Sequence, residues 1–183
     1  MGEIYSSWYD WTDRNILESI LNECSPRVVV EAASGPNVAV PTILHNIHLN
    51  SAYVSIDIRK EHLQLQSLPL HSKENQGIMA DATYLPLRDG SVDLFIFHHA
   101  LDDILETKGF NGMWASITEA LRTLRHNGQM IFSHCVFSND RYTKEISLEN
   151  VARFLKKIMI GSFQSIKGRR QEWLFVNEIT PVQ

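Results

Sequence analysis

The sequence has few cysteines and no excess of basic residues, and each shortage argues against a class of protein. Only Cys24 and Cys135 are present, which is too few for a disulfide scaffold, and they lack the spacing of a metal site. Lysine and arginine number 17 against 21 aspartate and glutamate residues, so the formal charge is -4. Nucleic acid is therefore not an expected partner. The scarcity of cysteine favours a reducing, cytoplasmic location.

A long hydrophobic run is also missing. The most apolar stretch, residues 28–44, is interrupted by Glu31, Pro36 and Pro41, which argues against a membrane span. The N-terminal segment shows neither the basic nor the apolar region of a secretory signal. With 183 residues, 44% of them hydrophobic, and no internal repeat, the chain is expected to form a single domain over residues 1–183.

Short apolar runs alternate with helical patterns along the chain. We expect strands over residues 27–30, 52–56, 76–80, 92–98 and 130–132, and helices over residues 36–48, 60–70, 111–125 and 148–160. Asn127-Gly128 is expected to cap the third of these helices. Residues 163–166 and 173–179 should pair as a closing antiparallel hairpin. The alternation predicts right-handed βαβ units and hence an α/β fold with a mostly parallel sheet.

Polar or small residues follow the first three predicted strands. In such sheets, ligands bind beyond the carboxyl ends of the strands, where the strand order reverses. Residues 31–37 are mostly small and let a ligand approach the backbone closely. Asp57 ends the second strand, where a carboxylate accepts hydrogen bonds from ribose hydroxyls, and Asp81 ends the third, where it can accept one from a purine amine. A structural interpretation stays open, because tight turns and turn-forming aspartates need no ligand.

As an ordered set, these segments resemble the class I S-adenosylmethionine-dependent methyltransferases. The resemblance covers residues 27–133 and runs through VVVEAASGPN, YVSIDIRKEHL, GIMADATYLPLRDGSVDLFIFHHAL and ITEALRTLRHNGQMIFS. It implies a Rossmann-like, doubly wound, mostly parallel seven-stranded sheet with an antiparallel C-terminal hairpin. The family's loops commonly carry three glycines, whereas here Ala33 and Asn37 stand at the outer glycine positions and only Gly35 remains.

The resemblance also implies a cofactor, S-adenosyl-L-methionine, and methyl transfer to a small-molecule acceptor. Glu31 would order the loop and the amino-acid end of the cofactor, Asp57 would hold the ribose, and Asp81 would hold the adenine amine. The full set of implied cofactor-binding residues is Glu31, Ala32, Ala33, Ser34, Gly35, Asp57, Ile58, Asp81, Ala82 and His98. No metal is expected.

His98 and His99 end the fourth predicted strand and are the candidates for a catalytic base, with His134 after the next strand. A packing role stays open for all three, because one of any two consecutive strand residues points away from the site. Transfer to an amine or a thiolate also needs no base. Residues 102–112 and 138–147 are expected to be loops that recognise the substrate.

The aromatic N-terminal segment, residues 1–25, is expected to form a helical lid over a cofactor-binding core of residues 26–183, or to pack on the sheet. A homodimer is a further way to complete the pocket. The loss of both outer glycines leaves an alternative function open. In that alternative, the protein is methyltransferase-like, has lost methylation, and either binds a partner or catalyses a different step in the same pocket.

Overall fold

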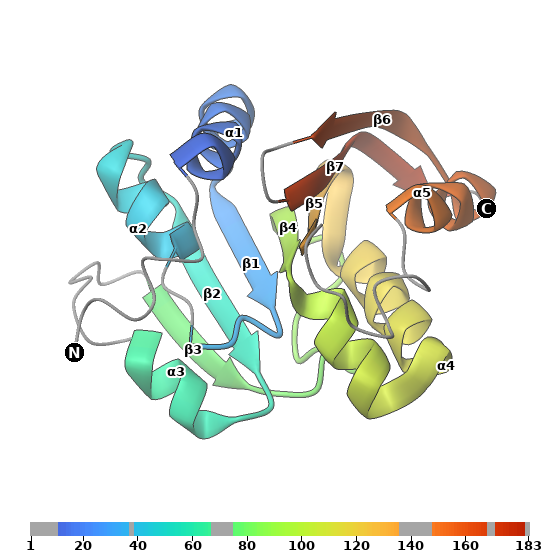
Figure 1. Cartoon of the computed structure of the whole chain (residues 1–183), viewed down its shortest axis with the longest axis horizontal. Helices are drawn as coiled ribbons and strands as arrows, with labels where there is room; N and C mark the ends of the chain where they lie inside the picture. The colour runs from blue at the N-terminus through green and yellow to red at the C-terminus, as the bar shows by residue number, and fades with distance from the viewer. Residues whose placement is uncertain (1–10, 37–38, 67–74, 136–147, 168–170, 182–183) are drawn as a thin grey trace.

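The structure is a computed structural model, and it describes residues 11–36, 39–66, 75–135, 148–167 and 171–181 (Figure 1). Seven strands form one sheet in the order β3-β2-β1-β4-β5-β7-β6. They are β1 (Val28–Ala32), β2 (Ala52–Asp57), β3 (Asn75–Met79), β4 (Val92–His98), β5 (Leu124–Cys135), β6 (Met159–Lys167) and β7 (Gln171–Pro181). Strands β1 to β5 pair in parallel, and β7 pairs antiparallel with both β5 and β6. The predicted Rossmann-like, doubly wound sheet with its C-terminal hairpin is confirmed.

Helices cover both faces of this sheet. They are α1 (Trp11–Cys24), α2 (Ala39–Asn46), α3 (Lys60–Gln66), α4 (Ala100–Thr123) and α5 (Leu148–Ile158). Helices α1 and α2 lie on one face and α4 and α5 on the other (Figure 1). Apolar residues of α1 and α2 pack with Val29, Leu94 and Ile131, and those of α4 and α5 pack with Val30 and Phe95. None of the described helices is long and apolar enough to cross a membrane.

The fourth helix starts earlier than the sequence pattern predicts. Residues 102–112, expected to be a loop, belong to α4, which begins at Ala100 rather than near residue 111. Leu101, Ile104 and Leu105 are 3–6% exposed and pack into the core, and their helical spacing explains why the segment folds as a helix. The helix is interrupted at Gly109, whose φ of 67° breaks it into two halves.

Asn127-Gly128 does not cap that helix, so this prediction is wrong. Helix α4 ends at Thr123, the next residue is extended, and the pair lies inside β5. Asn127 has a φ of 60°, and the pairing of β5 with both β4 and β7 shifts register around this point. The turn chemistry of Asn-Gly therefore forms an irregularity in a strand rather than a helix end.

Other predicted boundaries shift by a few residues. Helix α2 begins at Ala39 rather than at Pro36, which lies in a turn, and α3 ends at Gln66. The expected continuation of α3 to residue 70, the start of α2 at residues 37–38 and the loop 138–147 fall outside the described residues.

Asp93, near the start of β4, fixes the point where the strand order reverses. It is 5% exposed, and its Oδ2 accepts hydrogen bonds from the backbone N–H groups of Arg27 and Val28, both at 2.8 Å. Its Oδ1 pairs with Arg125 Nη1 at 2.6 Å. These bonds hold β4 beside β1, although about 60 residues separate the two strands. A doubly wound sheet binds its ligand at the other end of these two strands, in the crevice outside their carboxyl ends.

Candidate functional site

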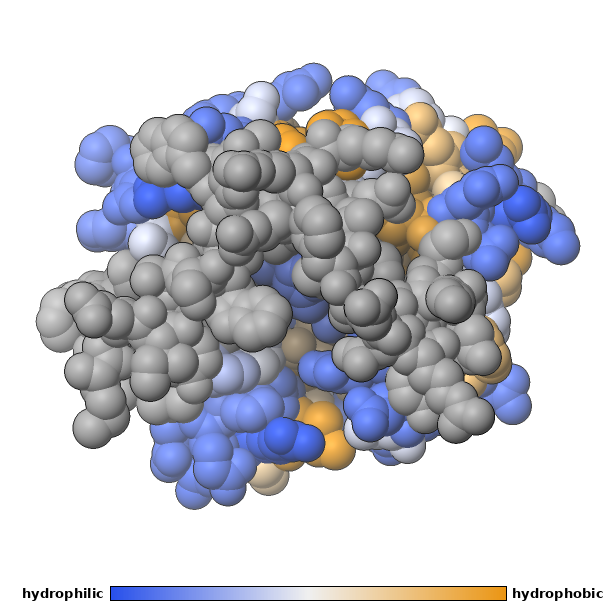
Figure 2. Space-filling view, viewed as in Figure 1, coloured by the Kyte–Doolittle hydropathy of each residue, from blue (hydrophilic) through white to orange (hydrophobic). Residues whose placement is uncertain are grey.

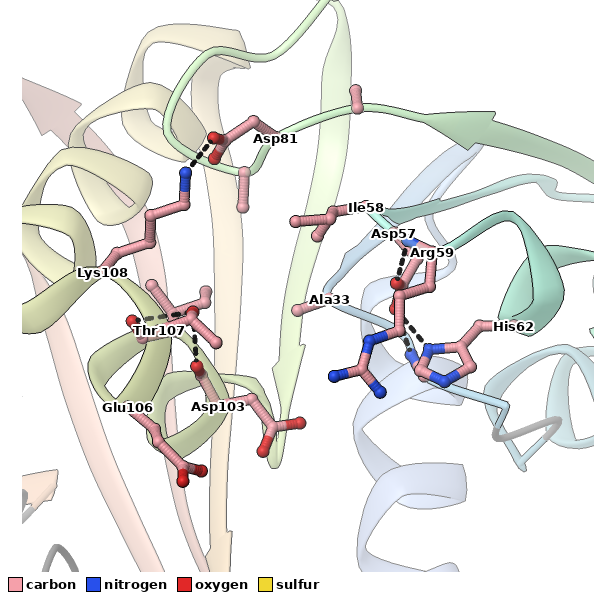
Figure 3. Close-up of a pocket in the computed structure, with 14 residues that line it drawn as sticks. Ala33, Asp57, Ile58, Arg59, His62, Asp81, Asp103, Glu106, Thr107 and Lys108 are labelled. Atoms are coloured by element: carbon pink, nitrogen blue, oxygen red, sulfur yellow. Dashed lines mark hydrogen bonds and ion pairs between the residues drawn. The ribbon is translucent and has the colours of Figure 1, made fainter.

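A pocket of about 200 Å³ lies between the carboxyl ends of β1 to β3 and the first half of α4 (Figure 3). On the strand side it is lined by the predicted site residues Ala33, Gly35, Asp57, Ile58, Asp81 and Ala82. Arg59, His62 and Ala80 complete that side. Helix α4 contributes Asp103, Ile104, Glu106, Thr107 and Lys108. The strand ends thus meet at one pocket, as expected for parallel strands.

The loop after β1 keeps a glycine-type backbone. Ala33 has a φ of 47° and Gly35 a φ of 59°, both in the left-handed region that favours glycine. A Cβ added to Gly35 would meet no atom of the described residues within 4 Å, which leaves room beside the loop within the described part of the chain. Ala33 carries its methyl group into the pocket at one of the positions where the sequence departs from the family's glycines.

Asp57 connects this loop to the next strand end. Its side chain is 6% exposed. Its Oδ2 accepts a hydrogen bond from the Gly35 N–H at 2.8 Å and lies 3.2 Å from His62 Nδ1. Its Oδ1 accepts a bond from the Arg59 N–H at 2.8 Å. Because a carboxylate offers about four acceptor positions, Asp57 can order the loop and still accept one further donor from the pocket.

Asp81 lines the opposite end of the pocket, and the neighbouring side chains stabilise its charge. Its Oδ1 accepts hydrogen bonds from the N–H and the hydroxyl of Thr83 at 2.9 and 2.8 Å. Its Oδ2 pairs with Lys108 Nζ at 2.6 Å. The Lys108 ammonium, followed by the Thr83 N–H, lowers the pKa of the Asp81 carboxyl below its ordinary value. Ile58, at 60% exposed, offers an apolar surface beside it.

Glu31 lies next to the loop but does not line the pocket. It is 1% exposed, and its Oε2 accepts a hydrogen bond from the Tyr53 hydroxyl. Burial raises the pKa of Glu31 to about 8, against the lowering effect of the Tyr53 bond. Its Oε1 is buried without a hydrogen-bond partner among the described residues. Ala32 and Ser34 are likewise buried and do not line the pocket.

His98 and His99 are not among the residues that line this pocket. His98 is 4% exposed, its Nδ1 is 2.7 Å from Ser133 Oγ, and its ring stacks on Trp173 with centroids 5.7 Å apart. Burial, reinforced by the neighbouring His99, holds the pKa of His98 well below its ordinary value. These contacts place a neutral His98 in a packed cluster. A catalytic role for either histidine stays a prediction, and the side chain of His134 is outside the described residues.

Helix α4 supplies a polar wall of the pocket from the segment 102–112, which we expected to recognise the substrate as a loop and which the structure shows as a helix. Burial and the nearby charges of Asp102 and Glu106 raise the pKa of Asp103, while Arg59 lowers it from the other side of the pocket. The available signal was the apolar spacing of Leu101, Ile104 and Leu105, which indicates a helix with its polar residues on the other face. Among the described residues no group of three or more His, Cys, Asp or Glu side chains is arranged to hold a metal ion.

Residues 30–132 match the family described as a methyltransferase domain, and the chain belongs to that family. No curated protein matches the sequence. A S-adenosylmethionine-dependent methyltransferase from Aquifex aeolicus has a TM-score of 0.72 and 13% identity, covering 95% of this chain and 96% of that chain. N-methyltransferase NodS from Bradyrhizobium japonicum, in complex with S-adenosyl-L-homocysteine, has a TM-score of 0.71 and 11% identity, covering 97% and 93%. The [4+2]-cyclase SpnF has a TM-score of 0.70 and 10% identity, covering 93% and 82%. At these identities the likeness shows the fold.

Proposed function

We propose that this protein transfers a methyl group from S-adenosyl-L-methionine to a small-molecule acceptor. The observation that supports this most directly is that Gly35, Asp57 and Asp81 line one pocket, although they follow three different strands. Each offers a different contact: a loop backbone at a left-handed glycine, a buried carboxylate and a partly exposed carboxylate. By the resemblance to the class I methyltransferases, these contacts would serve the amino-acid, ribose and adenine groups of the cofactor, in this order.

The described residues fit such a cofactor. Asp57 retains an acceptor position for a ribose hydroxyl, and the exposed side chain of Ile58 can contact the face of a purine. Gly35 leaves space for close approach to the loop backbone. Glu31 is buried beside the loop and does not line the pocket, so the role that we assign to it is to order the loop rather than to contact the cofactor.

The chemistry then depends mainly on positioning. When bound, the cofactor would supply an electrophilic methyl carbon on a sulfonium: an acceptor atom that attacks this carbon in line with the C–S bond takes the methyl group, and S-adenosylhomocysteine leaves with the electron pair of that bond. Holding two reactants in such a geometry can contribute about 7–11 kcal/mol to lowering the barrier. In this chain the ordered loop and Asp57 orient one reactant, and Ala33 and Ile104 give the pocket apolar surface that excludes water. An amine or a thiolate acceptor requires no catalytic base.

A second candidate function is a different reaction in the same pocket. The methyl group of Ala33 lines the pocket at a family glycine position, and the acceptor positions of Asp81 are largely used by Thr83 and Lys108. The similar structure of a [4+2]-cyclase is a precedent for this fold supporting other chemistry.

Ligand binding and product mass test these candidates. A ligand at 100 times its dissociation constant stabilises a protein by about 2.7 kcal/mol, which for this length raises Tm by about 5–10 °C. We expect S-adenosylmethionine and S-adenosylhomocysteine to produce such shifts. Acceptor mixtures incubated with methyl-labelled cofactor should then give a product that carries the label. Binding without label transfer would favour the second candidate, and the lack of any shift would contradict the proposed methyl transfer.

A further inference from the structure

Lys108 joins the two walls of the pocket at the end where Asp81 lies. Its Nζ is 2.6 Å from Asp81 Oδ2, and the two side chains are 40% and 39% exposed. Lys108 belongs to α4 and Asp81 follows β3, so the pair crosses from the helix wall to the strand wall (Figure 3). The pair therefore closes one end of the pocket.

Two glycines of α4 place Lys108 in this position. Gly109 has a φ of 67° and interrupts the helix directly after Lys108. A Cβ added to Gly112 would lie 2.2 Å from Lys108 Cβ and 3.9 Å from Thr83 Cγ2. Only glycine at position 112 leaves room for the stem of Lys108 beside the loop of Asp81 and Thr83. The two glycines that follow Lys108 in the sequence therefore direct its side chain toward Asp81.

The pair also limits what Asp81 can bind. Thr83 uses two acceptor positions on Oδ1, and Lys108 uses one on Oδ2. One of about four carboxylate positions remains, and it lies on the oxygen that already receives an ammonium group. The partly positive hydrogens of an adenine amine would be repelled there by the Lys108 charge. An amine that binds Asp81 well must displace Lys108.

We propose that Lys108 is an affinity-determining residue of the pocket, a displaceable partner of Asp81 that opposes the binding of an adenine group. The inference rests on the proposed function, because it assumes that an adenosyl group enters this pocket. The volume of about 200 Å³ agrees with it, since pockets for ligands of this size usually exceed about 300 Å³. Moving the flexible side chain of Lys108 enlarges the pocket without moving the sheet.

Calorimetry with S-adenosylhomocysteine on four full-length proteins tests the proposal: wild type, Lys108→Met, Asp81→Asn and the double variant. Methionine keeps the length of the side chain and removes its charge. Breaking a half-exposed ion pair changes an equilibrium constant by about two- to fivefold. Because the ligand no longer has to break this pair in Lys108→Met, the variant should bind about two- to fivefold tighter than wild type. In the Asp81→Asn background, Lys108→Met should leave the affinity unchanged. Lys157→Met, an exposed lysine of α5, is the matched control and should also change nothing.

The outcomes separate this proposal from the function on which it rests. If wild type binds and Lys108→Met binds equally or more weakly, Lys108 does not oppose the ligand and the inference is overturned, while the proposed function stands. Equal tightening in both backgrounds would also overturn it, because a general change in charge would then explain the effect. If none of the four proteins binds the nucleoside, the proposed function fails and the inference fails with it.

Discussion

The Asp57 carboxylate accepts a hydrogen bond of 2.8 Å from the backbone N–H of Gly35. This bond ties the end of β2 to the loop after β1, and the contact of Asp57 with His62 extends the connection to α3. One buried carboxylate therefore orders the loop and faces the pocket. Its removal should affect the shape of the site as well as its direct contacts.

We expect Asp57→Ala to weaken the binding of S-adenosylhomocysteine by about ten- to a hundredfold. A charge-assisted hydrogen bond contributes about 1.5–3 kcal/mol, which converts to this range. Calorimetry on the folded variant measures the effect. Asp89→Ala serves as the control, because Asp89 is 79% exposed and pairs with Arg122 away from the pocket. Unchanged affinity in Asp57→Ala would remove Asp57 from the site.

Reciprocal exchanges at positions 33 and 35 should have opposite effects. Both residues have positive φ values, 47° and 59°, and an alanine in this region costs about 1–2 kcal/mol. Gly35→Ala should lower the free energy of unfolding by about that amount, since the described residues place no atom within 4 Å of the added Cβ to cause a clash. Ala33→Gly should raise it by up to about 1 kcal/mol, because the flexibility of glycine in the unfolded chain offsets part of the gain.

Denaturant titration of the two loop variants checks these signs. Ala33→Gly should also bind the nucleoside more tightly, because it removes a methyl group that lines the pocket. A loss of stability in Ala33→Gly would show that the alanine is unstrained and that the loop differs from the geometry described.

Glu31 should make the protein less stable as the pH rises. Its pKa is raised from 4.5 to about 8 in the folded state, so the folded protein binds an extra proton between these values. The contribution of protonated Glu31 to the free energy of unfolding is therefore fully present below about pH 4.5, and it is lost as the pH rises toward 8. Glu31→Gln keeps the shape without titrating, and the stability advantage of the variant over wild type should grow across this range. Thermal melts at several pH values measure it, and parallel curves for the two proteins would contradict the assignment.

His98 should act in the opposite direction. Its pKa lies well below the ordinary value of 6.5, so the unfolded chain binds a proton that the folded protein resists. The stability associated with neutral His98 is therefore lost as the pH falls through about 6.5. His98→Phe retains a ring to stack on Trp173. The variant should have a lower free energy of unfolding than wild type at neutral pH, and its free energy of unfolding should decrease less than that of wild type when the pH is lowered. Denaturant titrations near neutral pH and at about pH 5.5 compare the two, and an unchanged acid dependence would show that His98 does not titrate in this way.

The surface around α3 is mainly hydrophilic, as the polar sequence of this helix predicts. In Figure 2 the described side chains on this face are mainly hydrophilic around α3, with small hydrophobic patches beside it. The large exposed apolar side chain that lines the pocket is Ile58. Ile58 is exposed because it follows the last residue of β2. The sequence indicates only that the strand ends before Ile58, and it does not indicate that the side chain lines a pocket.

The sequence by itself determined the fold and one side of the pocket. Apolar strands that alternate with helical segments allow few topologies, because parallel strands need crossover connections and these are right-handed. Gly35, Asp57 and Asp81 then had to meet, since the carboxyl ends of parallel strands lie at one edge of the sheet. No contact between distant side chains was needed for these predictions.

The direction of Lys108 and the contacts of other individual side chains were decided only by tertiary structure. The break of α4 at Gly109 directs Lys108 to Asp81, which is 27 residues earlier. His98 contacts Ser133 and Trp173 and is not among the residues that line the pocket, because alternation along a strand leaves the choice of face to the packing of its neighbours. Such contacts depend on the directions of side chains from separate elements, which local patterns do not specify.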